Sequence, residues 1–142
     1  MSDEDKSINN AADNYIKKHA LKVEIALKEI TPQLFSEFLI ERGASQICLS
    51  CGSVDLVVPE STDLVMEGDK FIPYASPDEN EIAEFGAENF VNYVTYSKID
   101  ADRTLTYSNM QYSVHCMNCG FIIHYKAANA IKWYADKKAV KG

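Results

Sequence analysis

The sequence predicts an α+β domain in which two short cysteine motifs fasten an antiparallel sheet that is flanked by helices. Apolar residues recur at helical spacing near both ends of the chain, which is typical of amphipathic helices. The middle of the chain is rich in β-branched and aromatic residues interrupted by turn-forming residues, which is typical of short antiparallel strands. A chain of 142 residues is long enough to bury a hydrophobic core as one unit.

The first helix is predicted over residues 11–30, where apolar residues follow one another at steps of three and four. This stripe consists of Ile16, Ala20, Val23, Leu27 and Ile30. A stripe of about two heptads fits two arrangements. We favour a helix that packs on its own domain, and we keep a dimerising pair of helices as the alternative.

A second helix is predicted directly afterwards. Thr31 can cap its first turn, and Pro32 suits the first helical position. Its apolar face consists of Leu34, Phe35, Phe38 and Leu39. Gly43 can take the positive φ that commonly ends a helix. Residues 1–45 are therefore expected to form an N-terminal helical hairpin, joined in one compact unit to an α+β domain at residues 46–142.

The central part of the chain is predicted to form strands with one short helix. Residues 54–58 are β-rich and end at Pro59, and Gly68 suits the tight hairpin turn of MEGDKF. Ser76 and Glu79 can form a capping box that starts a helix ending near Gly86. This region belongs to a long acidic insert at residues 59–110.

Residues 89–99 are rich in β-branched and aromatic side chains, which favours a strand over the alternative of a helix at 87–97. A turn is expected at 100–103 and further strand at 104–116. Alanine-rich residues 126–138 predict a C-terminal helix. Its core-facing residues are expected to be Ala127, Ile131 and Tyr134. Trp133 is about 100° away from Tyr134 on a helix, so one of the two is expected in the core and the other is a candidate contact residue.

The cysteines carry the clearest chemical signal. The only four in the chain occur in CLSCG at 48–52 and CMNCG at 116–120. Each Cys-x-x-Cys pair can supply two thiolates from one tight turn, and Zn²⁺ binds four such ligands at tetrahedral corners. Glycine after the second cysteine allows the sharp reversal with little strain. We therefore predict one structural zinc ion, bound by Cys48, Cys51, Cys116 and Cys119.

These two motifs resemble the paired knuckles of zinc-ribbon domains. The resemblance covers residues 46–58 and 111–125, and it implies one zinc ion beside a small antiparallel sheet. The chain departs from many ribbons in the long spacer, residues 52–115, between its motifs. In general build, as a small acidic domain with an inserted ribbon, it also resembles phage and prophage accessory proteins.

Other uses of the cysteines are weaker predictions. A redox centre would favour a cysteine at a helix N-terminus, whereas strands are expected after both motifs. Disulfides would require an oxidising compartment. His115 and His124 lie near the second motif, but on an extended strand the residue beside a ligand points to the opposite face. Both histidines are therefore expected to be surface or packing residues.

Charge and composition limit the function. The net charge of −7 divides into −2 for residues 1–54, −9 for 55–109 and +4 for 110–142. We find no secretory signal, no membrane-spanning apolar run and no catalytic motif, so we expect a cytoplasmic protein that is not an enzyme. We predict a regulatory or accessory module that binds another protein, with a basic partner for the acidic insert.

Two rival functions remain. The first is nucleic-acid binding, in transcription regulation, through the basic C-terminal segment. Its lysines are Lys126, Lys132, Lys137, Lys138 and Lys141. The chain as a whole is too acidic for strong non-specific binding, because phosphate affinity comes largely from lysine and arginine. The second rival, a redox or metal-dependent enzyme, is the weakest prediction.

Overall fold

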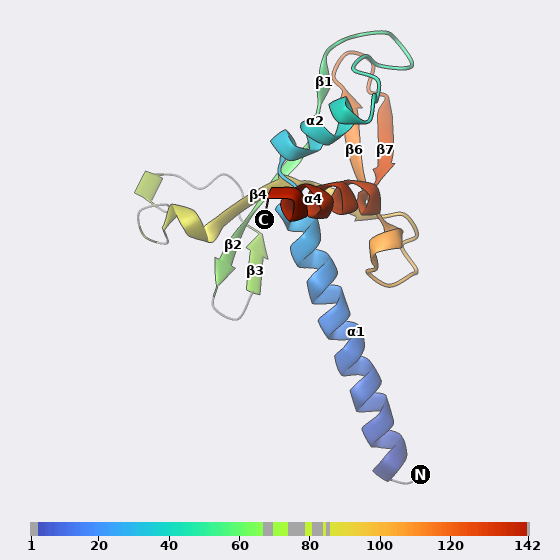
Figure 1. The fold of residues 1–142 in the computed structure, drawn as a ribbon, viewed down its shortest axis with the longest axis vertical. Coiled ribbons are helices and arrows are strands. Elements are labelled where there is room, and N and C mark those ends of the chain that lie inside the picture. Colours follow the sequence, from blue (N-terminus) through green and yellow to red (C-terminus); the bar gives the residue numbers. More distant parts are fainter. Residues whose placement is uncertain (1–2, 67–69, 74–78, 81–83, 85, 142) are drawn as a thin grey trace.

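The computed structural model describes residues 3–66, 70–73, 79–80, 84 and 86–141, and it has the predicted α+β architecture (Figure 1). The helices are α1 (Asp3–Glu29), α2 (Pro32–Glu41) and α4 (Ala127–Lys141), with single 3₁₀ turns η1 (Ala87–Asn89) and η2 (Tyr107–Asn109). The strands are β1 (Leu56–Val57), β2 (Glu60–Met66), β3 (Lys70–Pro73), β4 (Phe90–Val94), β5 (Tyr96–Lys98), β6 (Met110–Cys116) and β7 (Ile122–Lys126).

The strands form two antiparallel sheets. In the four-stranded sheet, β6 is central. β7 pairs along one edge of β6, while β5 and β1 share the other edge, β5 near Tyr112 and β1 near Cys116. The three-stranded sheet has the order β3–β2–β4. Because β4 passes into β5 through the single residue Thr95, one extended segment belongs to both sheets.

The strand prediction for residues 89–99 is confirmed, and the helical alternative at 87–97 is wrong. Only the short η1 turn is helical there, and β4 then pairs with β2 over its full length. Residues 104–106 are not in a strand, because the chain forms a loop and the η2 turn before β6 begins. The buried side chain of Asn109 organises this loop by bonding the N–H and C=O of Asp100 and the C=O of Thr104.

The proposed tight turn at Gly68 and the capping box at Ser76 lie outside the described residues. On either side of the first position, Met66 of β2 pairs with Lys70 of β3 in an antiparallel ladder. Two residues of helix are described at 79–80.

The hydrophobic core lies between the helices and the four-stranded sheet. Its buried residues are Val23, Leu27, Ile30, Phe35, Phe38, Val94, Met110, Tyr112, Val114, Ala127, Ala130 and Trp133. The Tyr112 hydroxyl donates a hydrogen bond of 2.8 Å to the Leu27 carbonyl, which satisfies a polar group inside this core. Helices from both ends of the chain therefore share one core with the sheet.

The second helix begins and ends as its residues predict. The Thr31 hydroxyl accepts a hydrogen bond from the N–H of Leu34, and Pro32 occupies the first helical position. Gly43 has a φ of 72°, and the N–H of Ala44 bonds back to the Leu39 carbonyl. Together with Gly43 N–H bonding to the Ile40 carbonyl, these bonds form a Schellman motif.

The first helix is longer than predicted, and its stripe has two different environments. Val23, Leu27 and Ile30 are buried, whereas Ile16 is 51% exposed. Figure 1 shows why: only the C-terminal half of α1 lies against the sheets, and its N-terminal half projects away from the rest of the molecule. The packing prediction is therefore correct only for the second half of the stripe.

The C-terminal helix packs through a face that is rotated from the predicted one. Ala127 and Ala130 are fully buried and Trp133 is nearly so, while Ile131 and Tyr134 lie at the margin of the core. Small alanines allow a close approach of α4 to the sheet. The Trp133 indole N–H donates to the Glu41 carboxylate on α2, so its polar atom has a partner.

A buried ion pair joins α1 to the three-stranded sheet. The ammonium group of Lys28 contacts the carboxylate of Asp63, and both side chains are almost inaccessible to solvent. Asp63 also accepts a hydrogen bond of 2.8 Å from the Tyr93 hydroxyl. Lys28 lies 3.9 Å from the ring centre of Phe71 and contacts Glu24 one turn earlier on α1. Nothing in the local sequence around Lys28 predicts this cluster.

Replacing Asp63 with alanine should lower the free energy of unfolding by about 3 kcal/mol, because Lys28 then stays buried with only the half-exposed Glu24 as a counter-charge. Chemical denaturation measures this loss. The control is a Lys28→Met/Asp63→Leu double variant, which removes both charges and should lie within about 1 kcal/mol of the wild type. An equal loss in both variants would show that packing, and not the ion pair, is responsible.

Candidate metal centre

The first cysteine motif forms a tight turn just before β1. The Cys48 sulfur accepts hydrogen bonds of 3.4 Å from the backbone N–H groups of Ser50 and Cys51. The Gly52 N–H bonds to the Cys48 carbonyl at 2.8 Å, and Gly52 has a φ of 77°, in the left-handed region that glycine adopts without strain. Backbone donors therefore point at the sulfur, as a thiolate requires.

The second motif repeats this geometry between β6 and β7. The Cys119 N–H lies 3.5 Å from the Cys116 sulfur, and the Gly120 N–H bonds to the Cys116 carbonyl at 2.9 Å. Gly120 has a φ of 83°. The two turns are also joined directly, because the N–H of Met117 donates to the carbonyl of Asp55 at 2.9 Å.

Strand pairing brings the two turns to the same end of the four-stranded sheet. Leu56 of β1 pairs with Cys116 of β6, so the chain leaving the first turn lies beside the chain entering the second. All four cysteine sulfurs lie within 4.8 Å of one another. This is the only group of histidine, cysteine and acidic side chains with metal-binding geometry in the part of the chain that the structure describes.

The sulfur spacing fits a tetrahedral metal ion and does not fit disulfides. The Cys48 and Cys119 sulfurs are 3.6 Å apart, and those of Cys51 and Cys116 are 3.7 Å apart. A disulfide would require about 2.05 Å. Four ligands at a Zn–S distance of about 2.3 Å lie about 3.8 Å from one another at the corners of a tetrahedron. The four residues can therefore bind one ion without rearrangement.

The pKa values of the thiols also favour a bound cation. A hydrogen bond from the Asn118 amide, at 3.3 Å, and one from the backbone N–H of Ser53 lower the pKa of Cys51 to about 6. The backbone N–H of Phe121 lowers the pKa of Cys119, but partial desolvation by nearby atoms and the neighbouring thiols outweigh it and raise this pKa to about 11. Four thiolates this close repel one another, and a bound cation removes that conflict.

The site has a buried side and an open side. Cys48 and Cys116 are buried, whereas Cys51 and Cys119 are exposed. Both histidines near the second motif lie away from the sulfurs: His115 is within 3.0 Å of the Ser113 hydroxyl, and His124 is exposed on β7. Asn118 is the site residue that the sequence analysis missed. Its only signal is an amide side chain directly before the last cysteine.

Comparisons with known protein families, curated proteins and solved structures find no match to this chain. The class of site is therefore defined by its own geometry, as a four-thiol centre able to hold a metal ion. Within the described residues, no helix has the length and apolar character needed to cross a membrane.

Replacing Gly120 with alanine should lower the free energy of unfolding by about 1–2 kcal/mol, because an L-residue with a side chain is strained at this φ. No atom lies within 4 Å of the added Cβ, so the loss comes from the backbone alone. Urea denaturation of the metal-loaded protein measures it. A Gly120→Asn variant should lose less, because asparagine tolerates this conformation. Equal losses in the two variants would contradict the explanation.

Proposed function

We propose that the four cysteines bind one structural zinc ion and that the chain is a zinc-ribbon-type module without enzymatic activity. The observation that carries this proposal is the set of sulfur–sulfur distances, which match a tetrahedral thiolate site. Soft thiolate ligands favour zinc over magnesium or calcium. With four protein ligands the ion has no position left for water or substrate, which is typical of structural sites.

The zinc ion would connect parts of the chain that are far apart in sequence. Its ligands flank the spacer at residues 52–115, so the ion closes a long loop at the outer end of the four-stranded sheet. β1 contributes only two residues to that sheet, and hydrogen bonds alone hold it weakly. The metal would therefore supply much of the stability of this end of the molecule.

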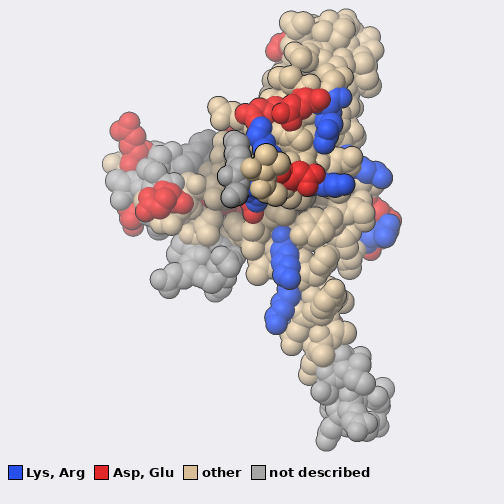
Figure 2. All heavy atoms as spheres, viewed as in Figure 1, with Lys and Arg blue, Asp and Glu red and all other residues tan. Residues whose placement is uncertain are grey.

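We further propose that the module binds a basic region of another protein through its acidic insert. Figure 2 shows acidic side chains gathered around the lobe that contains β2 and β4, without lysine or arginine among the described atoms of that face. Exposed carboxylates there belong to Glu60, Glu79, Glu84 and Glu88. Such a field attracts and orients a basic partner and repels nucleic acid.

Ion pairs within the chain make the nucleic-acid alternative less attractive. Lys137 of α4 lies 3.1 Å from a carboxylate oxygen of Glu37, and Lys138 lies 2.7 Å from one of Glu29. Figure 2 shows this alternation of acidic and basic side chains over α4 and its neighbours. Lysines that are already paired release few counterions on binding phosphate, which reduces their contribution to affinity.

Purified protein should contain about one zinc ion per chain, with Zn–S distances of about 2.3 Å by X-ray absorption. Replacing Cys116 with serine should remove the metal and cause a large loss of thermal stability, because the energy of metal binding is also folding energy. Removal of the metal with a chelator should give the same loss, and added zinc should reverse it. A Ser113→Ala variant is the matched control on β6. Full zinc content in the Cys116→Ser variant would end the proposal.

Replacing Glu79, Glu84 and Glu88 with glutamine should weaken binding to a lysine-rich peptide, because the substitutions remove charge and keep the size of each side chain. Binding of the unmodified protein should also weaken as the salt concentration rises, since the screening length falls to about 8 Å at physiological ionic strength. Surface-binding kinetics should show the change mainly in the association rate.

The control for the acidic surface is Lys132→Gln on α4, an exposed lysine far from the insert in sequence. It changes the net charge in the opposite direction and should leave peptide binding nearly unchanged or slightly stronger. If Lys132→Gln strengthens binding by as much per unit of charge as the glutamate substitutions weaken it, then net charge, and not the insert, governs binding.

A further inference from the structure

The outer edge of β7 is a strand edge without a partner in the described part of the chain. β7 pairs only with β6, and in Figure 1 it forms the side of its sheet opposite β1. The Cys116 N–H bonds to the Phe121 carbonyl, so β-ladder alternation directs the backbone groups of Ile123 and Tyr125 toward β6. The N–H and C=O groups of Ile122 and His124 therefore point outward.

This edge lacks the features that normally protect an exposed strand. Edge strands are commonly blunted by lysine, proline or a bulge. β3, at the edge of the other sheet, begins with Lys70 and ends with Pro73. From residue 121 to 125, β7 and the residue before it read Phe-Ile-Ile-His-Tyr, with the first lysine only at position 126. Ile122 is 44% exposed on the open face of the sheet.

Asp, Glu, Lys and Arg residues are sparse around the edge, although the whole chain carries −7. Residues 43–59 contain one charged side chain, Asp55, and residues 110–125 contain none. On the face that Figure 2 shows, the outermost part of this end is uncharged except for one acidic group at its margin. Two copies of so acidic a chain repel each other over most of their surfaces. Two copies can therefore approach each other most closely at the edge of β7.

We infer that β7 pairs with β7 of a second copy of this chain, antiparallel and about a two-fold axis at Ile123. In this register Ile122 of one copy exchanges both backbone hydrogen bonds with His124 of the other, and the reverse pair does the same. All outward groups of these residues are then satisfied. Ile123 faces its own equivalent, a β-branched pair that suits adjacent strands, and no like charges are opposed.

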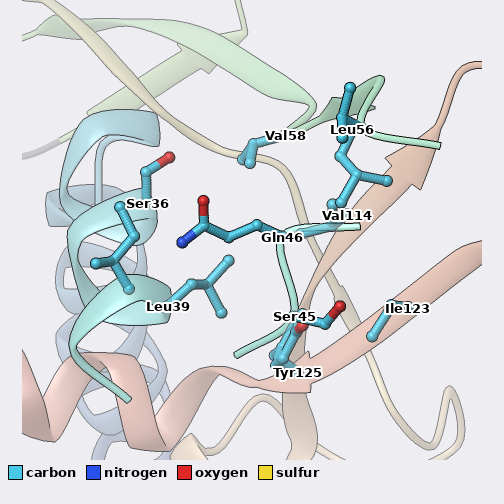
Figure 3. A pocket seen from close by; sticks show the side chains of 11 residues that line it. Ser36, Leu39, Ser45, Gln46, Leu56, Val58, Val114, Ile123 and Tyr125 are labelled. Carbon is cyan, nitrogen blue, oxygen red and sulfur yellow. The ribbon is translucent and has the colours of Figure 1, made fainter. Parts of the chain in front are cut away.

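Side chains on the helix-covered face support the same register. Ile123 and Tyr125 line a mostly apolar groove of about 220 Å³ between α2 and the sheet, with Val114, Leu56 and Leu39, and the amide of Gln46 lies within it (Figure 3). Phe121, which is 40% exposed, comes to lie opposite Tyr125 of the second copy. The apolar surface of each groove then continues across the axis, and the two four-stranded sheets become one.

The test is sedimentation velocity on the full-length protein with its metal content and circular dichroism checked for each variant. The wild type should associate reversibly between about 10 μM and about 1 mM, as small interfaces do. In an Ile122→Lys/His124→Lys variant the new charges oppose each other across the axis, and association should weaken at least about tenfold. In an Ile122→Lys/His124→Glu variant they attract, and association should return.

A wild type that stays monomeric throughout this range overturns the inference. So does association that survives the double-lysine variant, which would place the contact elsewhere, such as on the projecting half of α1. Equal weakening in both double variants overturns the two-fold register. Should either variant fail to fold, amide hydrogen exchange on the wild type decides: protection of Ile122 and His124 must rise with protein concentration, while Ile123 and Tyr125 are protected throughout. Unchanged exchange at Ile122 and His124 also overturns the inference.

Discussion

The convergence of four thiols on one point governs the arrangement of this chain. Cys48 and Cys51 must meet Cys116 and Cys119 although residues 52–115 separate the two pairs. Closing a loop of this length costs about 4 kcal/mol relative to a one-residue loop, whereas structural zinc in small peptides supplies about 10–16 kcal/mol. Binding of a metal with that affinity would offset the free-energy cost of closing the loop. The sheet assists this closure, because pairing of Leu56 with Cys116 places the two turns side by side.

Local chemistry explains which parts of the fold could be predicted. The cap at Thr31, the glycine stop at Gly43 and the two Cys-x-x-Cys-Gly turns depend on neighbouring residues, and the structure reproduces them. Pairing between distant strands depends on residues that are far apart in sequence, so local patterns do not predict it. The rotation of α4 follows from tertiary packing as well: two alanines permit close contact with the sheet, and Trp133 gains Glu41 as a partner. Periodicity alone favours the larger Ile131 over an alanine as a core-facing residue.

The cluster of Lys28, Asp63 and Tyr93 shows why part of the structure escapes sequence analysis. In sequence, Lys28 and Asp63 are two of many charged residues, and a solvated position is the ordinary expectation for each. The three groups can be buried because they form an ion pair and a hydrogen bond with one another, and because the Lys28 ammonium also contacts the ring of Phe71. All four residues come from separate elements. No window of neighbouring residues contains that information. Asn109 differs, because its partners lie within the preceding ten residues, although no turn or cap motif marks them.

The three-stranded sheet enters and leaves the rest of the molecule at one place. The N–H of Thr95 bonds to the carbonyl of Pro59 at 2.9 Å, so the residues just before β2 and just after β4 are in contact. The chain between them departs from and returns to the same spot, as an inserted domain does. An insertion or deletion in the loops of this lobe would therefore leave its two ends, and the cysteine-bearing sheet, in place. The strand that carries Asp63 tolerates such changes less, because buried Lys28 of α1 requires a carboxylate at that position.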